Sequence, residues 1–299
     1  MPAVESTDAP QADERRMPFS EHLVELRTRL RNSVIAVLIG TIVAYAFRAP
    51  LFALLARPLI IAWAETPKEA GLPAPEIVFT GPAEGFMVLF KLALLAGIFL
   101  SCPWVFRELW KFISPGLYRR ERRFALPFVI VSALLFTGGA AFAYLYVLPA
   151  SYKYFLGYST DSMGIIRDVF GRHEVWGYKI DIKLTEAFAI KPMITMDEYF
   201  GLTSMLLLLF GVVFELPLVL SVLAMIGIVS PRGLWRFNRY FILIAFIAGA
   251  VLTPGDLVVG QIAMGLSLTV LYNLSIVVAL LVGRQRRKKA AEAEVVDAE

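Results

Sequence analysis

Cysteine and histidine are nearly absent from this chain of 299 residues. Its one cysteine, Cys102, cannot form a disulfide within the chain. The two histidines, His22 and His173, are widely separated and offer no cluster of metal ligands. We therefore expect no metal, no cofactor and no redox chemistry.

Charge is also scarce. Only 18% of the residues are charged, whereas 58% are hydrophobic, which excludes an ordinary soluble protein and is typical of a polytopic membrane protein. No paired acids, histidine cluster or nucleophile with a nearby base occurs within the apolar runs, so we expect no enzyme activity. The composition predicts one all-α membrane domain.

Apolar runs of about membrane length predict six transmembrane helices. We expect them at residues 30–47, 85–106, 124–148, 202–227, 241–252 and 257–282. A helix needs about 20 residues to cross roughly 30 Å of hydrocarbon, so the fifth run is short and implies local bilayer thinning or protein cover. The membrane domain as a whole is expected at 19–283.

The segments outside these runs have their own patterns. Residues 1–18 lack periodicity and predict a disordered tail, and 284–299 form a second tail. An amphipathic helix is expected from Phe19, lying in the membrane interface before the first span. Residues 149–201 form an extramembrane insertion in which 178–184 alternate like a strand, paired as a hairpin with 169–176.

Basic residues predict the orientation. Nineteen of the 29 Lys and Arg residues fall on the side that holds both termini, and nine fall on the other side. The positive-inside rule therefore places both termini in the cytoplasm. No small-residue cleavage pattern follows the first apolar run, so we expect no removable signal peptide.

The fourth run, 202–227, carries Glu215 near its middle and Pro217 two residues later. A carboxyl group at mid-membrane costs about 2.5 to 3.5 kcal/mol, so it should face protein, water or a partner. Pro217 has no N–H and leaves the carbonyl of Val213 without its helical donor, which a protonated Glu215 can supply. We expect a polar, kinked notch in this helix.

Four motifs occur in order along the chain and together resemble the TatC family. They are HLVELRTRL at 22–30, SPGLYRRERR at 114–123, FELP at 214–217 and LTPGD at 252–256. That family is the multispanning receptor of the twin-arginine protein translocase, which exports folded proteins. The resemblance covers about residues 19–283 and departs from the family in a longer insertion at about 157–196 and in Gly255, where a second proline is common.

The resemblance implies a binding site for the paired arginines of a signal peptide. Its acids are Glu25 and Glu121, and Leu26, Arg27 and Phe112 shape the same patch. A carboxylate holds a guanidinium by two parallel hydrogen bonds, which a lysine cannot imitate. From residues alone, Glu25 is a solvated i,i+4 partner of its neighbouring arginine, and Glu121 is one acid among loop arginines. Those loop arginines repel a cationic ligand unless lipid phosphates or acids engage them.

Other positions have weaker functional signals. The resemblance makes Glu215 the polar point of a concave, glove-like bundle with short last two spans, contacting a single-span partner. Pro58, Pro217 and Asp256 match family positions, whereas as structure alone Pro58 is a turn former and Asp256 a helix cap. Interhelical hydrogen bonds are sufficient to explain the polar residues Lys91, Gln261 and Asn273 within the spans.

The sequence thus predicts a receptor of the inner (plasma) membrane that acts without bond chemistry. By resemblance, its partners are twin-arginine signal peptides, membrane lipids and single-span proteins like TatA and TatB, in a complex that contains several copies of the chain and uses the proton motive force. The short fifth span is a docking place for a partner helix, and no nucleic acid is expected. The alternative is a proton-coupled transporter of small solutes that uses Glu215; it would need internal repeats and more charged residues along a path, and neither is evident.

Overall fold

The computed structural model describes residues 19–65, 77–113, 125–157, 174–175, 178–179, 194–226, 228–252 and 259–296. Nearly all of these residues are helical. The helices are α1 (Phe19–Ala46), α2 (Arg48–Glu65), α3 (Pro82–Ile113), α4 (Ala125–Phe142), α6 (Met196–Phe214), α7 (Leu216–Ile226), α8 (Pro231–Leu252) and α9 (Val259–Val296). A π-helical turn, Ala143–Val147, continues α4, and the helix runs on to residue 157.

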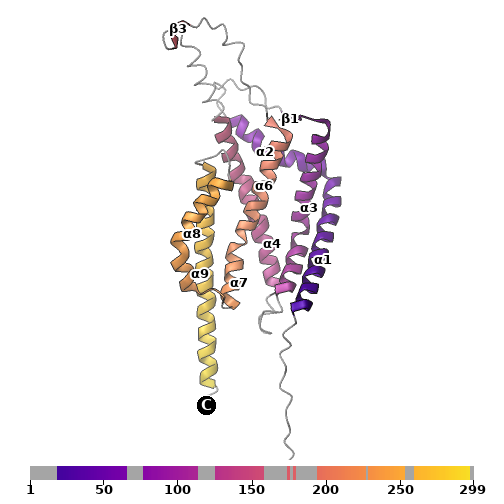
Figure 1. Cartoon of the computed structure of the whole chain (residues 1–299). Coiled ribbons are helices and arrows are strands. Elements are labelled where there is room, and N and C mark those ends of the chain that lie inside the picture. The colour runs from indigo at the N-terminus through magenta and orange to yellow at the C-terminus, as the bar shows by residue number, and fades with distance from the viewer. Residues whose placement is uncertain are drawn as a thin grey trace, which may run out of the picture.

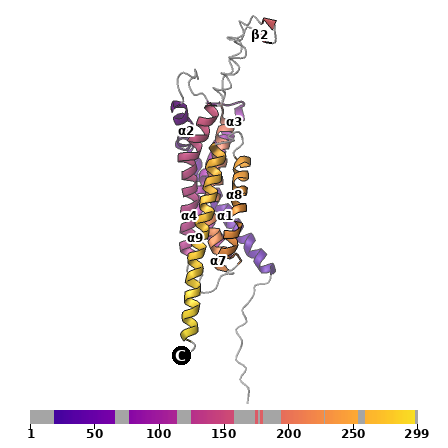
Figure 2. The same cartoon turned by 90° about the vertical axis from the view of Figure 1, so that its left-hand side faces the viewer.

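The long helices stand side by side in one bundle (Figure 1). Packing contacts join α1 to α3, α3 to α4, α4 to α6, α7 to α9 and α9 to α8. The bundle is broad in Figure 1 and narrower in Figure 2, so the helices form a wall rather than a closed ring. At its upper end in Figure 1 lies α2, and at its lower end α1 begins and α9 ends.

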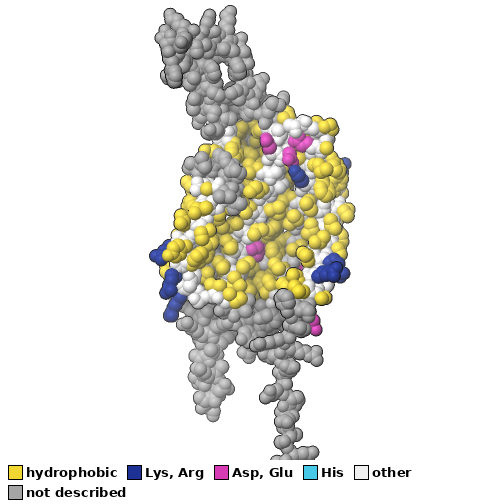
Figure 3. Space-filling model, viewed as in Figure 1, with side chains coloured by type: hydrophobic (Ala, Val, Ile, Leu, Met, Phe, Trp, Pro, Cys, Tyr) yellow, Lys and Arg dark blue, Asp and Glu magenta, His cyan; other side chains and the backbone are white. Residues whose placement is uncertain are grey.

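Five helices of the described residues are long and apolar enough to cross a membrane: Glu21–Ala46, Pro82–Ile113, Leu126–Gly157, Met196–Ala224 and Gln261–Leu280. Figure 3 shows hydrophobic side chains over most of one face of the bundle, with Lys and Arg towards its ends. The helix α8 is not among the five. Its first nine residues include three arginines and Asn238, so the start of this helix is polar.

Several helices extend beyond the runs that the sequence predicts. The amphipathic segment from Phe19 and the first span form one helix, α1, without a break between them. The helix expected at 241–252 begins ten residues earlier, at Pro231, and has 22 residues, and the last helix, α9, has 38 residues, so the prediction that the last two spans are short is wrong. The helix α8 is longer than its apolar run, because a helix whose arginine side chains stay exposed tolerates them in its first turns.

The fourth predicted span is interrupted at Glu215, where α6 ends before α7 begins. This is the position that Pro217 predicts, because proline cannot donate to the preceding turn. The prediction that the Glu215 side chain donates to the Val213 carbonyl is wrong. The backbone N–H of Glu215 donates to the carbonyls of Val212 and Val213, while its carboxyl group contacts the hydroxyl of Ser132 on α4.

Buried tyrosines hold the upper end together. The Tyr199 hydroxyl on α6 donates to the carbonyl of Leu55 on α2 at 2.6 Å. The Tyr152 hydroxyl lies 2.8 Å from the Thr203 hydroxyl. Ion pairs at the same end join Lys91 to Asp197 and Lys153 to Glu65. These contacts tie α2, α3, the end of the α4 helix and α6 into one unit.

Short strands lie beyond the upper end of the bundle. Strands β1 (Ile77–Val78) and β4 (Ile194–Thr195) pair in parallel. Strands β2 (Glu174–Val175) and β3 (Tyr178–Lys179) pair antiparallel, with Glu174 opposite Lys179. These four residues confirm the hairpin that the alternating pattern predicts. The rest of the predicted strand at 180–184, together with the tail at 1–18, lies outside the described residues.

Candidate functional site

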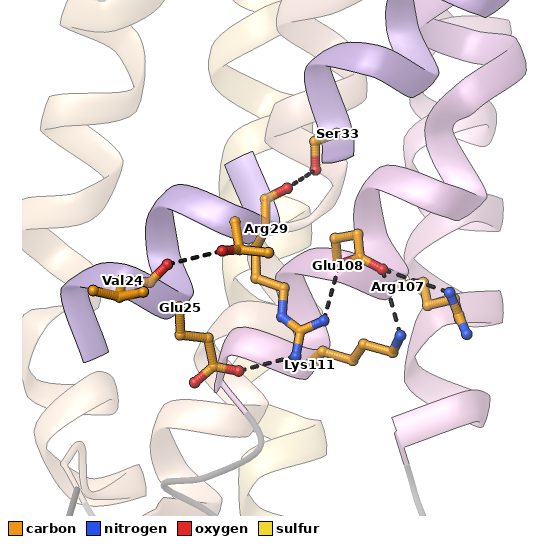
Figure 4. A network of polar contacts seen from close by, with 8 residues as sticks. Val24, Glu25, Arg29, Ser33, Arg107, Glu108 and Lys111 are labelled. Atoms are coloured by element: carbon orange, nitrogen blue, oxygen red, sulfur yellow. Dashed lines mark hydrogen bonds and ion pairs between the residues drawn. The ribbon is translucent and has the colours of Figure 1, made fainter. Parts of the chain in front are cut away.

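At the lower end, the first turns of α1 pack against the last turns of α3 and form a polar network (Figure 4). The helix α1 contributes Glu25 and Arg29, which are four residues apart and so lie on one helix face. The helix α3 contributes Arg107, Glu108 and Lys111. We call these five residues the lower-end network.

Arg29 joins the two acids of the network. Its Nη2 lies 3.0 Å from Oε1 of Glu25, and its Nη1 lies 3.1 Å from Oε2 of Glu108. The pair with Glu25 is the one that the i,i+4 spacing predicts. The contact with Glu108 spans 79 residues of sequence and depends on the packing of α1 against α3.

Glu108 is the most buried charged group of the network, with 2% of its side chain exposed. The other Glu108 oxygen, Oε1, lies 3.4 Å from Nζ of Lys111 and 3.5 Å from Nη1 of Arg107. A buried carboxylate needs such cations, because an uncompensated charge in the interior is costly. Glu108 is therefore held as an ion.

Glu25 is less completely bonded. Its side chain is 20% exposed, and among the described residues its Oε2 and the Nε of Arg29 have no hydrogen-bond partner although both atoms are buried. The guanidinium of Arg29 thus holds Glu25 by one hydrogen bond, where two parallel bonds are possible. One acceptor oxygen of Glu25 is thus unbonded in the described part of the chain.

The other predicted binding residues, with one exception, lie at the same end of the bundle as Glu25. Leu26 and Arg27 are exposed on the next positions of α1. Phe112, near the end of α3, stacks on His22 of α1 with ring centroids 4.4 Å apart. Glu121 lies outside the described residues, so the structure does not place it relative to Glu25.

Sequence reasoning missed Glu108. It lies just beyond the predicted second span, between Arg107 and Lys111, where an acid looks like one charge of a polar loop. The helix α3 continues through Ile113, and Glu108 comes seven residues after the buried Ser101, so the two residues lie on one helix face. Helical periodicity extended past the apolar run would have placed it on the packed face.

A second polar point lies at mid-bundle. Glu215 is 9% exposed, and its Oε1 has no hydrogen-bond partner among the described residues. Its carboxyl group contacts Ser132, whose hydroxyl also accepts a bond of 3.1 Å from the Trp110 indole. No lysine or arginine is among the buried residues described. Glu215 therefore differs from Glu108, which three cations surround.

The structure describes all but one of the remaining predicted positions. Pro58 is buried within α2, so its prediction as a turn former is wrong, and Pro217 is the second residue of α7. Asp256 lies outside the described residues. Gln261 bonds the Phe246 carbonyl at 3.2 Å, and Asn273 pairs with Asn238 at 3.1 Å, so their prediction as interhelical bonds is confirmed. In the described part of the chain, no three His, Cys, Asp or Glu side chains are grouped to hold a metal.

Comparisons with known proteins agree with the motifs. Residues 21–266 match the family model described as Sec-independent protein translocase protein (TatC). A TatC protein of Desulforapulum autotrophicum is 41% identical over 281 residues, covering 94% of this chain and 91% of that protein. One of Magnetococcus marinus is 34% identical, covering 95% and 90%. A crystal structure of a twin arginine translocase receptor, TatC, superposes with a TM-score of 0.64 at 33% identity, covering 88% of this chain and 99% of the other.

Proposed function

The chain belongs to the TatC family of Sec-independent protein translocase proteins, a multi-pass membrane component of protein transport and not an enzyme, and from this we propose that it is a receptor for twin-arginine signal peptides. The binding site in this proposal is the lower end of the bundle. Its centre is Glu25, with Leu26 and Arg27 exposed beside it and Phe112 stacked on the neighbouring His22.

One observation carries the proposal: Glu25 already holds a guanidinium. The Arg29 side chain lies 3.0 Å from one Glu25 oxygen, and the other oxygen has no partner among the described residues. A site that accepts one guanidinium in this geometry has the chemistry to accept the guanidinium of a ligand, and it discriminates against lysine because only arginine can form the two-bond fork.

The second arginine of the ligand needs a second acid. We assign it to Glu121 from the family motif SPGLYRRERR, in the segment that links α3 to α4. That segment leaves α3 at Ile113, immediately after Phe112, so it starts at the same end of the bundle as Glu25. Two carboxylates would then serve two arginines.

The membrane arrangement that fits this site has six crossings, with α8 as the sixth beside the five apolar helices. In Figure 1, α1 begins and α9 ends at the lower end, as an even number of crossings requires. Most Lys and Arg residues fall on that side, which places both tails, 1–18 and 284–299, in the cytoplasm. We propose that the membrane is the plasma, or inner, membrane, and that the wall of helices is the predicted concave, glove-like bundle.

Single-span partners like TatA and TatB are proposed to contact Glu215 and α8. Glu215 offers an unpartnered oxygen at mid-bundle, and α8 exposes Ile244 and Ile247 by 50% and 54%. Ala245 is only 1% exposed, so the docking face is that of the two isoleucines. Several copies of the chain with such partners and lipids would export folded cargo, driven by the proton motive force.

The proposal is tested by measuring the affinity of the detergent-purified protein for a twin-arginine signal peptide and for its twin-lysine version. We expect the arginine peptide to bind more tightly by about 1.5 to 3 kcal/mol, the value of a charged hydrogen bond. Glu25→Ala and Glu121→Ala should each remove part of that preference. Glu198→Ala, which removes an exposed acid at the upper end, is the matched control and should leave it unchanged. Equal binding of both peptides to the unmodified protein would refute the receptor assignment.

A further inference from the structure

The lower-end network contains an arginine of the protein itself at the place where a ligand arginine should bind. We propose that Arg29 is an internal competitor that occupies Glu25 in the unliganded receptor, and that buried Glu108 retains Arg29 when a ligand guanidinium replaces it at Glu25. This inference rests on the proposed function and concerns the regulation of the same site. It assigns a role to Glu108, which no motif singles out.

The two bonds of Arg29 are unequal. Its partner Glu108 is 2% exposed, whereas Glu25 is 20% exposed. Removing Arg29 takes from a buried carboxylate its shortest ion pair and leaves it only the longer pairs with Lys111 and Arg107, whereas separating a partly exposed i,i+4 pair costs little because water replaces the partner. When one of the two bonds must break, Arg29 therefore leaves Glu25 and stays with Glu108.

The bond to Glu25 is also incomplete. Arg29 reaches Glu25 through Nη2 alone, while its Nε and the second Glu25 oxygen are both buried without a partner in the described part of the chain. A ligand guanidinium free to orient can offer two parallel bonds to the same carboxylate. It thus replaces a one-bond contact with a two-bond contact.

The contacts of Glu108 favour its continued binding to Arg29 after a ligand guanidinium has replaced Arg29 at Glu25. Arg29 is its shortest ion pair at 3.1 Å, and the pairs with Lys111 and Arg107 are longer, at 3.4 and 3.5 Å. The Asn32 side chain, one turn after Arg29 on α1, also bonds Glu108. Figure 4 shows the guanidinium of Arg29 between the two acids, with Glu108 on the side of α3. The displaced cation thus remains bound to the protein and does not have to return to water.

The test measures twin-arginine peptide affinity for four variants of the full chain. Arg29→Gln removes the competitor and should raise the affinity about threefold, the value of a modest ion pair. Glu108→Gln leaves Arg29 with Glu25 as its only acid in the network, so the affinity should fall about tenfold. Combining Glu108→Gln with Arg29→Gln should restore at least the affinity of the unmodified protein.

Arg107→Gln combined with Glu108→Gln is the matched control. Arg107 also contacts Glu108, and its removal changes the net charge by the same amount as removal of Arg29. Because Arg107 contacts Glu108 and not Glu25 within the lower-end network, the affinity of this double variant should stay about tenfold below that of the unmodified protein. A purely structural role of Glu108 would give no rescue by Arg29→Gln, since the second substitution would only add to the damage.

A fall in affinity on Arg29→Gln, or no rescue in the double variant, would overturn the inference. If Glu108→Gln does not fold, as judged by elution and thermal unfolding, Arg29→Gln alone decides, because Arg29 is 27% exposed and its loss leaves Glu108 with two cations. These failures leave the receptor assignment intact as long as the unmodified protein prefers the arginine peptide to the lysine peptide. Loss of that preference in the unmodified protein overturns both.

Discussion

Glu108 and Glu215 are the acids that the bundle buries among its described residues, and their surroundings differ. Three cations surround Glu108, which marks it as a permanent ion with an internal role. Glu215 has the hydroxyl of Ser132 and a free oxygen. We propose that a polar group on a partner helix meets this oxygen, because a polar group at mid-membrane without an internal counterion is otherwise costly.

Replacing Glu215 tests this difference at the level of one residue. Glu215→Leu removes an incompletely bonded carboxyl group, so the purified protein should keep its stability or gain about 1 to 3 kcal/mol in free energy of unfolding. Binding of the signal peptide at the lower end should not change. Co-purification of a single-span partner should decrease, and Glu215→Gln, which keeps a hydrogen-bonding side chain, should retain more of it.

The same variant separates the receptor from the alternative of a proton-coupled transporter. A transporter that carries protons on Glu215 would move a small solute in liposomes containing this protein alone, and Glu215→Leu would abolish that flux. We expect no such flux from either protein. Loss of peptide binding in Glu215→Leu would contradict the separation of the two sites.

Among the elements, the pair α1 and α3 determines the geometry of the lower-end network. These helices approach closely at two glycines: a Cβ on Gly97 would lie 2.6 Å from the backbone nitrogen of Thr41, and one on Gly40 would lie 2.7 Å from the Gly97 carbonyl oxygen. Small residues at such a crossing let two membrane helices pack by van der Waals contact. The crossing brings Arg29 of α1 within reach of Glu108 of α3.

Gly97→Ala should therefore destabilise the protein by about 1 to 3 kcal/mol, the usual cost of overpacking, and should weaken signal-peptide binding. Thermal unfolding and peptide affinity measure the two effects. Gly85→Ala is the matched control, because Gly85 lies on the same helix with open space around its Cβ position. That change should be neutral or gain about 0.5 to 1 kcal/mol from helix propensity. Equal effects of both substitutions would argue against the close crossing.

The sequence predicts the elements better than it predicts their contacts. Apolar runs indicate the order of the long helices, and Pro217 indicates the break at Glu215, because these signals are local. The start of α8 at Pro231 escapes such reasoning, since its arginines resemble a loop while the backbone stays helical. The role of Glu108 cannot be predicted from local signals for a different reason. Glu108 contacts Arg29 only because α1 packs across α3, and the two residues are 79 positions apart in sequence.

At the scale of the whole molecule, the lower end is the proposed cytoplasmic side and the upper end, with α2 and the strands, is the opposite side. This orientation follows from the excess of Lys and Arg and from the position of the lower-end network. It also requires α8 to cross the membrane, because α8 is the only described helix between the lower end of α7 and the upper end of α9.

Single cysteines test the orientation and the sixth crossing. In a Cys102→Ala background, Ile228→Cys, between α7 and α8, should react with an impermeant thiol reagent only from the cytoplasmic side. Phe79→Cys, after β1, should react only from the outside. Both native side chains are well exposed, at 69% and 65%, and Cys102 is buried. Labelling of both positions from one side would contradict the six-crossing arrangement.

The central claim is that Glu25 holds an arginine of the signal peptide, and a double-mutant cycle measures that contact most directly. Peptides with each arginine replaced in turn by lysine are titrated against the unmodified protein, Glu25→Gln and Glu121→Gln. We expect one of the two peptide arginines to couple to Glu25 by about 1.5 to 3 kcal/mol and the other to couple to Glu121. Additive losses, with no coupling between either arginine and Glu25, would contradict the account.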